Sequence, residues 1–172
     1  MSRGLGDVYK RQRVDILACD VAEHMGALAA QYNLPPELMR IEITETAYTG
    51  ESEAVDKLTA DLHTRGFSTY MDDFGTGQST LAMLKNVNVD VIKLDRTFVP
   101  VDGDRGRSAQ IVSSMLEMAQ SLHLPVVIEG IETNEQANML RHMGARYAQG
   151  FLYYRPMQAK DFEALLDGGN NN

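Results

Sequence analysis

The chain has 172 residues, of which 44% are hydrophobic and 23% are charged, a composition typical of one ordinary globular domain. Its net charge of -8, with no cluster of lysine and arginine after residue 13, argues against a DNA- or RNA-binding surface. The single cysteine, Cys19, excludes an internal disulfide framework and fits a reducing compartment, so we expect a cytoplasmic protein. No apolar run of 18 or more residues is present, and we expect no membrane contact by this segment.

Residues 1–12 have no helical or strand period and do not lead into the pattern that follows. The hexapeptide DVYKRQ at residues 7–12 matches one reading frame of a transposon-type sequencing adapter. We therefore interpret residues 1–12 as a non-native scar and exclude them from the fold. On this interpretation the native protein begins upstream, and the chain is truncated.

The first regular signals predict a helix, a strand, a helix and a second strand. Apolar residues at helical spacing predict a helix that ends near Tyr32, because two prolines follow at 35 and 36. Residues 39–44 alternate as a strand, with Glu42 on the face opposite its isoleucines. A second helix begins near Ser52 and stops at Gly66, and a strand from there ends at Asp72.

The second half of the chain repeats this alternation. We expect strands at 89–95, 125–128 and 147–153. A short helix around 81–84 precedes these strands. Between them lie a helix at 111–122 and one that starts at a capping box of Thr133 and Gln136 and stops at Gly144. A last helix spans about 159–166, so the domain covers 13–167, and we expect a disordered tail at 168–172.

Five alternations of strand and helix predict parallel βαβ units. Two α/β architectures compete on this pattern. An open, doubly wound sheet fits the number of units better, whereas a closed (β/α)₈ barrel needs eight strands and about 250 residues. The barrel is therefore possible only if the chain is a fragment.

Polar side chains recur at the ends of the predicted strands. The adjacent pair of Asp72 and Asp73 precedes a Gly-Thr-Gly loop, and by itself it fits a turn as well as a metal site. Because catalytic groups in barrels come from the carboxyl ends of several strands, the recurrence favours a site. The residues at these positions are Glu42, Asp72, Asp73, Lys93, Glu129 and Gln149.

These residue types suit phosphoryl chemistry. Carboxylates in this number would repel one another without cations between them, and two metal ions can activate water and neutralise an in-line displacement. Lys93 would lie among them, where an ammonium group can hold the attacking water or stabilise developing negative charge.

Five ordered motifs resemble the signature blocks of the EAL domain family. They are IEITE at residues 41–45, MDDFGTG at 71–77, IKLD at 92–95, IEGIET at 128–133 and AQGF at 148–151. The similarity runs from about residue 14 to 167. It implies a bacterial signalling phosphodiesterase that hydrolyses cyclic di-GMP to linear pGpG with Mg²⁺ or Mn²⁺. It also implies a (β/α)₈ TIM-type barrel, here incomplete and lacking about three N-terminal strands.

The resemblance also assigns roles to single residues. It implies that Glu42 and Asp72 are metal ligands, with Asp72 bridging two ions, and that Asp73 and Glu129 complete the second metal site. Lys93 would hold the attacking water and Gln149 would orient it. Of the remaining residues, Glu132 would be a further catalytic carboxylate, Asp95 would bind substrate, and Glu45 would fix the loop at 72–78, which the family also uses in homodimers.

The sequence departs from the family pattern in ways that limit the prediction. The Glu-Ala-Leu block and the asparagine block, which supply further metal ligands, belong to earlier strands that are absent here, and residues 163–165 match Glu-Ala-Leu only by chance. Gln78 and Thr80 also replace the usual Tyr and Ser. We therefore expect an incomplete two-metal site, a chain that is inactive alone, and an exposed sheet edge at 39–44.

Two other functions stay open on the sequence. One is a non-catalytic EAL-like module that binds cyclic di-GMP or a partner protein. The other is an unrelated α/β hydrolase or a doubly wound binding domain. The retained carboxylates favour the enzyme over the binding module.

Overall fold

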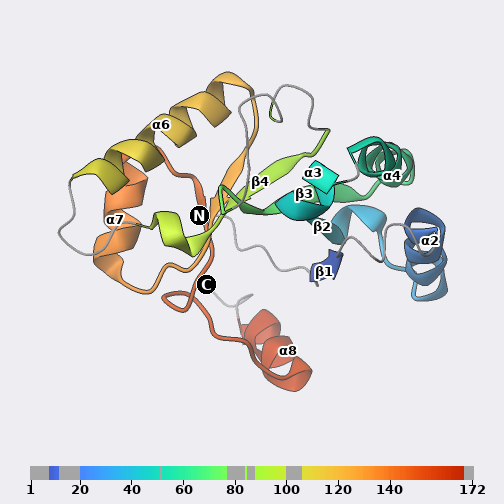
Figure 1. Cartoon of the computed structure of the whole chain (residues 1–172). Coiled ribbons are helices and arrows are strands. Elements are labelled where there is room, and N and C mark those ends of the chain that lie inside the picture. Colours follow the sequence, from blue (N-terminus) through green and yellow to red (C-terminus); the bar gives the residue numbers. More distant parts are fainter. Residues whose placement is uncertain are drawn as a thin grey trace.

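The structure is a computed structural model that describes residues 8–11, 20–50, 52–76, 84, 88–99 and 106–168. One parallel sheet of six strands organises it, and the strands lie side by side in the order in which they occur in the chain (Figure 1). The strands are β1 (Val8–Arg11), β2 (Arg40–Thr44), β3 (Ser68–Phe74), β4 (Val91–Leu94), β5 (Val126–Ile128) and β6 (Tyr147–Ala148). This arrangement confirms the predicted parallel α/β fold.

Helices connect the strands and pack outside the sheet. In Figure 1, α2 and α4 lie toward the β1 end of the sheet, whereas α6 and α7 lie toward its other end. The helices are α2 (Val21–Gln31), α3 (Glu45–Gly50), α4 (Ser52–Thr64), α6 (Arg107–Ser121), α7 (Asn134–His142) and α8 (Ala159–Gly168), with the short 3₁₀ turns η1 (Pro36–Leu38) and η2 (Arg96–Phe98).

The core lies between the sheet and the inner faces of these helices. Strand residues Ile41, Ile43, Met71 and Ile128 are fully buried. Burying a side chain of this size stabilises the fold by roughly 1.5–3 kcal/mol. The helices contribute Val55, Leu62, Val112 and Leu140, at most 1% exposed. The apolar positions that predict the helices are therefore the ones that face the sheet.

Local signals set the ends of the helices much as the sequence indicates. The side chain of Asp20 caps α2 by accepting a hydrogen bond from Glu23 N at 2.9 Å. The predicted capping box of Thr133 and Gln136 is present at the start of α7. Gly144 follows this helix with φ +95°, a left-handed conformation that glycine adopts without strain.

Three expectations about the strands are wrong. Strand β3 does not end at Asp72 but continues to Phe74, and β6 covers only Tyr147–Ala148 because the chain turns at 151–153 instead of staying extended. Strand β2 is not the edge of the sheet. Backbone pairing places β1 beside it, with Tyr9 opposite Ile41.

Some predicted features fall outside the described residues. These are the start of the first helix, all of the short helix around 81–84 except Leu84, the end of the loop at 77–78 and the tail from 169.

Candidate functional site

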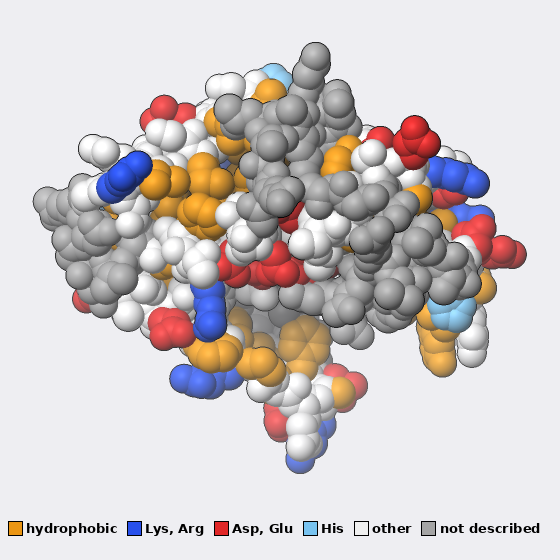
Figure 2. Space-filling view, viewed as in Figure 1, with side chains coloured by type: hydrophobic (Ala, Val, Ile, Leu, Met, Phe, Trp, Pro, Cys, Tyr) orange, Lys and Arg blue, Asp and Glu red, His pale blue; other side chains and the backbone are white. Residues whose placement is uncertain are grey.

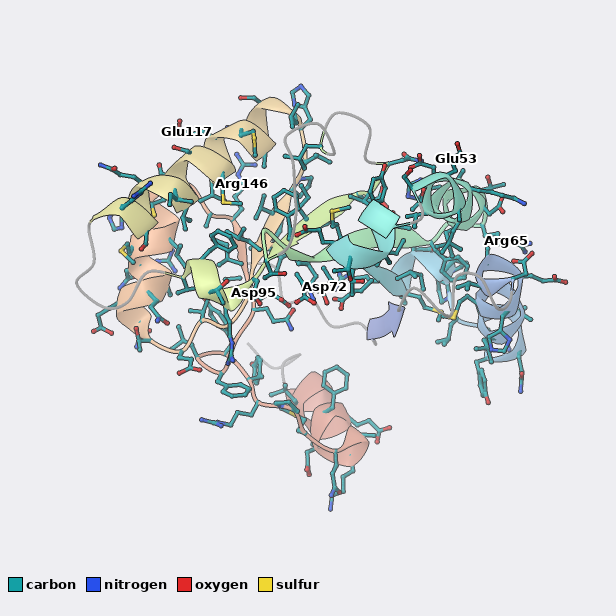
Figure 3. The ribbon with its side chains drawn as sticks, in the orientation of Figure 1. Glu53, Arg65, Asp72, Asp95, Glu117 and Arg146 are labelled. Atoms are coloured by element: carbon teal, nitrogen blue, oxygen red, sulfur yellow. The ribbon has the colours of Figure 1, made fainter. Side chains whose placement is uncertain are left out.

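The polar residues predicted at the strand ends do lie at one edge of the sheet. Parallel strands bring their carboxyl ends to the same side, which is where α/β proteins bind ligands. Asp and Glu side chains gather in the middle of the face shown in Figure 2, and the labelled Asp72 and Asp95 mark this edge in Figure 3. The contributing residues are Glu42 in β2, Asp72 and Asp73 in β3, Lys93 in β4, Glu129 directly after β5 and Gln149 directly after β6.

A β-bulge brings the two neighbouring aspartates together. Successive side chains of a regular strand point to opposite faces. The pairing of β3 with β4 shifts register between Met71 and Phe74, and Asp73 between them has φ +57° in the left-handed region. A bulge re-aims the side chains of the bulged strand. Carboxylate oxygens of Asp72 and Asp73 consequently lie within 4.8 Å of each other.

Lys93 is the centre of the buried part of the site. Its Nζ atom lies 2.5 Å from Glu42 Oε1, 3.0 Å from Asp72 Oδ1 and 2.7 Å from Glu129 Oε1. The side chains of Lys93, Glu42 and Asp72 are at most 4% exposed, whereas that of Glu129 is 17% exposed. The ammonium group of Lys93 on β4 therefore links three other strands, β2, β3 and β5, near their carboxyl ends.

These contacts keep Lys93 protonated. Burial acts to lower the pKa of Lys93, but hydrogen bonds to Glu129 and Glu42, together with the charges of these carboxylates, outweigh burial and raise the pKa above its ordinary value. The group is a hydrogen-bond donor with a fixed positive charge. It is not a general base at neutral pH.

Three carboxylates form a group that fits a cation. One oxygen each from Asp72, Asp73 and Glu129 lies within 4.8 Å of the others. Oxygens that bind one Mg²⁺ or Ca²⁺ at 2.0–2.6 Å lie at most about 4–5 Å apart, so the donor set and its spacing suit a hard divalent ion. Glu42 is not part of this group, and its Oε1 lies against Lys93 instead.

Glu45 fixes the backbone that follows the bulge. It begins α3 after β2, is 1% exposed, and its Oε2 accepts a hydrogen bond from Gly75 N at 2.9 Å. Gly75 has φ +92°, and a Cβ there would lie 2.6 Å from the Phe98 ring. The start of the loop at 72–78 is thus held by one buried carboxylate and by a position that only glycine fits.

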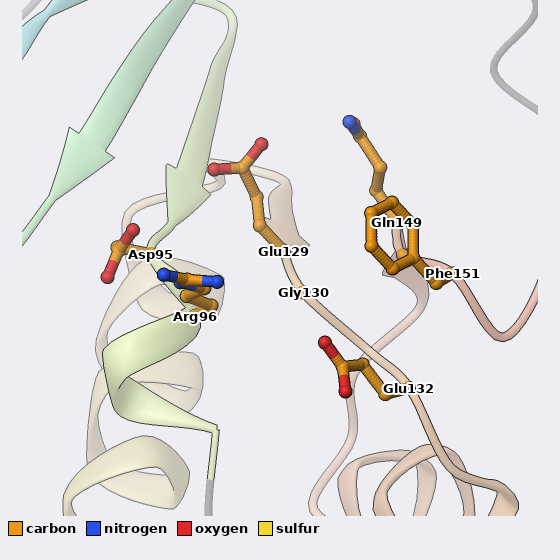
Figure 4. Close-up of a pocket in the computed structure, with 8 residues that line it drawn as sticks. Asp95, Arg96, Glu129, Gly130, Glu132, Gln149 and Phe151 are labelled. Atoms are coloured by element: carbon orange, nitrogen blue, oxygen red, sulfur yellow. The ribbon is translucent and has the colours of Figure 1, made fainter. Parts of the chain in front are cut away.

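A hollow of about 240 Å³ opens beside the carboxylate group (Figure 4). Glu129 belongs both to the carboxylate group and to the lining of the hollow. Gln149 and Glu132 line the hollow with exposed side chains, and hydrogen bonds from Gln149 N to Ile128 O and from Ile131 N to Gln149 O hold the Gln149 backbone. The lining residues are Asp95, Arg96, Glu129, Gly130, Glu132, Gln149, Gly150 and Phe151.

Asp95 lines this hollow as the N-cap of η2. Its Oδ1 accepts a hydrogen bond from Thr97 N at 2.8 Å. Burial acts to raise the pKa of Asp95, but the hydrogen bonds from Thr97 outweigh it and the pKa is lowered. Asp95 is thus held as an anion that faces the hollow.

Sequence reasoning missed two residues of the hollow, Arg96 and Phe151. Arg96 directly follows the IKLD motif, and Phe151 is itself the last residue of the AQGF motif. The available signals were therefore adjacency to a motif for Arg96 and membership of a motif for Phe151.

The protein-family comparison matches the EAL domain model over residues 14–156. Among curated relatives, the cyclic di-GMP phosphodiesterase RocR of Pseudomonas aeruginosa is 38% identical over 148 residues, which are 86% of this chain and 38% of RocR. NbdA of the same organism, also named a cyclic di-GMP phosphodiesterase, is 32% identical over 165 residues, which are 92% of this chain and 21% of NbdA. The chain spans about a fifth to two fifths of the length of these relatives.

Solved structures agree with this assignment. The EAL domain of Mycobacterium smegmatis DcpA superposes with a TM-score of 0.87 at 31% identity, over 94% of this chain and 72% of that one. The PaMucR phosphodiesterase in its c-di-GMP complex gives a TM-score of 0.84 at 28% identity, over 91% and 70%. Within the described residues, no helix has both the length and the apolar character needed to cross a membrane. By sequence and by fold, this chain belongs to the EAL domain family.

Proposed function

We propose that the chain is part of a metal-dependent phosphodiesterase domain that hydrolyses cyclic di-GMP to linear pGpG. The observation that carries this proposal is the arrangement of Glu42, Asp72, Asp73 and Glu129 around Lys93 at the carboxyl edge of the sheet. Three of these carboxylates contact one ammonium group, and Asp73 lies beside two of them, so the site has an excess of negative charge that divalent cations would balance. Relatives named as cyclic di-GMP phosphodiesterases support the choice of substrate.

The residues present fit Mg²⁺ or Mn²⁺. Asp72, Asp73 and Glu129 would hold one ion, and Asp72 with Glu42 would contribute to a second. Bound there, the ions would activate water and neutralise charge on the phosphoryl group. Another structural neighbour, BlrP1 of Klebsiella pneumoniae, was solved as a complex with manganese and cy-diGMP. That complex supports the proposal that a divalent ion binds in this fold.

The remaining polar residues would position the reactants. Lys93 would donate a hydrogen bond from Nζ to the attacking water or to a phosphoryl oxygen, since its raised pKa keeps it charged. Gln149 would orient that water from the end of β6. Glu132 would be a further carboxylate beside the reacting phosphate, and Asp95 would contact the substrate from the wall of the hollow.

We further propose that the sheet is part of a (β/α)₈ barrel that lacks about three N-terminal strands. The structural neighbours PaMucR and DcpA extend beyond this chain, which covers 70% and 72% of them. The missing strands would carry the other metal ligands. If residues 1–12 are an adapter-derived scar, β1 takes the place of a native strand beside β2.

A homodimer would form through the loop at 72–78, of which 77–78 lie outside the described residues.

A chimera tests this function. Residues 14–156 of the chain would replace the corresponding segment of RocR, and hydrolysis of cyclic di-GMP would be followed by chromatography. We expect the chimera to form pGpG. Loss of a residue that only supports a metal ligand typically costs roughly 10–100-fold in activity, and Asp72→Asn, which changes a proposed ligand itself, should reduce the rate at least as much. Asp61→Asn, an exposed position on α4, is the matched control. A folded chimera that binds cyclic di-GMP without cleaving it would instead support a non-catalytic module.

A further inference from the structure

The hollow beside the carboxylate group has an unusual balance of charge for a site that binds an anion. Three of its lining side chains are carboxylates, those of Asp95, Glu129 and Glu132. A cyclic dinucleotide carries two phosphodiester charges. The cations of the proposed function would balance Glu129, but Asp95 and Glu132 would still repel the substrate without positive charge on the walls of the hollow.

Among the described residues that line the hollow, Arg96 is the one cation. Lys93 lies nearby, but its ammonium group is buried and contacts three carboxylates, so it already balances protein charge. Arg96 is exposed, and Figure 4 shows it among the carboxylates of the hollow. Arg155 lies outside the lining, with its guanidinium 4.5 Å from the centroid of the Phe151 ring. Arg96 is therefore the lining side chain that offers positive charge to an anionic ligand.

The backbone at Gly130 is shaped to admit the Arg96 side chain. A Cβ atom at position 130 would lie 2.3 Å from Arg96 Cβ and 3.4 Å from Arg96 Cδ. Gly130 also has φ +71°. The stem of Arg96 thus lies against the backbone at Gly130, and a side chain at position 130 would displace it.

We propose that Arg96 is a substrate-binding residue that donates hydrogen bonds to the non-bridging oxygens of a phosphate of the cyclic dinucleotide. This inference rests on the proposed function. The planar guanidinium group matches two phosphate oxygens at once. A phosphate needs a cation among these carboxylates, whereas the uncharged edge of a base does not. The phosphate that Arg96 contacts would lie beside Glu129, which the hollow shares with the cation site.

Binding of two ligands to three forms of the chain tests the assignment. The dissociation constant would be measured by NMR titration, with Ca²⁺ present, for cyclic di-GMP and for its 7-deazaguanine analogue, which lacks the N7 acceptor that arginine contacts in guanine. The forms are the 172-residue chain, Arg96→Met and the control Arg146→Met. Arg146 is exposed and precedes β6, at the opposite end of the strands, so its loss removes the same charge away from the hollow.

We expect Arg96→Met to weaken both ligands by about tenfold or more, as for a lost hydrogen bond to a charged group, and Arg146→Met to change neither. Equal affinities for Arg96→Met and the unchanged chain would overturn the inference. A loss of affinity confined to cyclic di-GMP, which retains N7, would also overturn it, because Arg96 would then contact the guanine base and not the phosphate. An unchanged chain that binds neither ligand would overturn the inference as well, whereas the proposed function is tested separately by hydrolysis in the chimera.

Discussion

Lys93 and Asp72 form a buried ion pair, with Lys93 Nζ 3.0 Å from Asp72 Oδ1 and both side chains at most 4% exposed. The pair joins β4 to β3 at the point where the bulge turns Asp73 into the site. Since Glu42 and Glu129 contact the same ammonium group, one lysine holds the carboxylates of neighbouring strands in place. Stability and the geometry of the site therefore depend on the same residue.

Replacing Lys93 by methionine should destabilise the chain. Three carboxylates would then face one another without their buried counter-charge, and breaking a buried pair from one side costs about 3–5 kcal/mol. The free energy of unfolding would be measured by urea denaturation. Lys57→Met, at an exposed position of α4, is the control and should change it by less than about 0.5 kcal/mol. An equally small effect of Lys93→Met would show that the ion pairs do not stabilise the fold.

Glu45→Ala should loosen the loop that follows the two aspartates. The substitution removes the acceptor of the Gly75 N hydrogen bond, and hydrogen bonds to charged groups contribute about 1.5–3 kcal/mol. We expect faster amide hydrogen exchange at Gly75 and a comparable loss of stability. Glu45→Gln retains an acceptor oxygen and should preserve most of the protection. If Gly75 exchanges at the same rate in all three forms, Glu45 does not hold the loop.

Asp90→Ala should lower stability without weakening the cation site. Asp90 Oδ2 accepts a hydrogen bond from Thr69 N at 2.7 Å and lies 3.0 Å from His63 Nε2, at the amino ends of β3 and β4. Asp90 is partly exposed, so we expect a loss of about 1 kcal/mol in thermal denaturation, with Asp61→Ala as the surface control. Metal affinity that fell along with stability would show that the two ends of the strands are coupled.

The purified 172-residue chain should not hydrolyse cyclic di-GMP, because some metal ligands of the proposed two-ion site would lie on strands outside it. Chromatography of reactions with Mg²⁺ or Mn²⁺ would check this. Formation of pGpG that disappears in an Asp72→Asn variant would contradict the expectation and would show that the residues present suffice.

Much of the fold and site could be predicted from the sequence because the signals are local. Apolar patterns with Glu42, Asp72, Lys93 and Glu129 at or close to their carboxyl ends identify strands, and parallel connections bring these ends together. The resemblance to the EAL family rests on those same positions and is confirmed by the comparisons.

The rest depends on pairing between strands, which a local pattern does not show. The bulge at Asp73 arises from the register of β3 against β4, so the strand was predicted to end too early. Strand β1 forms through backbone pairing with β2, although its residues carry no strand period. In the sequence, Arg96 cannot be told from any other exposed arginine, because its close approach to the backbone at Gly130 is seen only in the structure.

The binding of Mn²⁺ to the carboxylate group of Asp72, Asp73 and Glu129 can be measured directly. Isothermal titration of the chain should show saturable binding, and Asp73→Asn should weaken it by about tenfold or more, while Asp61→Asn leaves it unchanged. Absence of Mn²⁺ binding by the folded chain, or equal binding by the Asp73→Asn variant, would show that these carboxylates do not form a metal site.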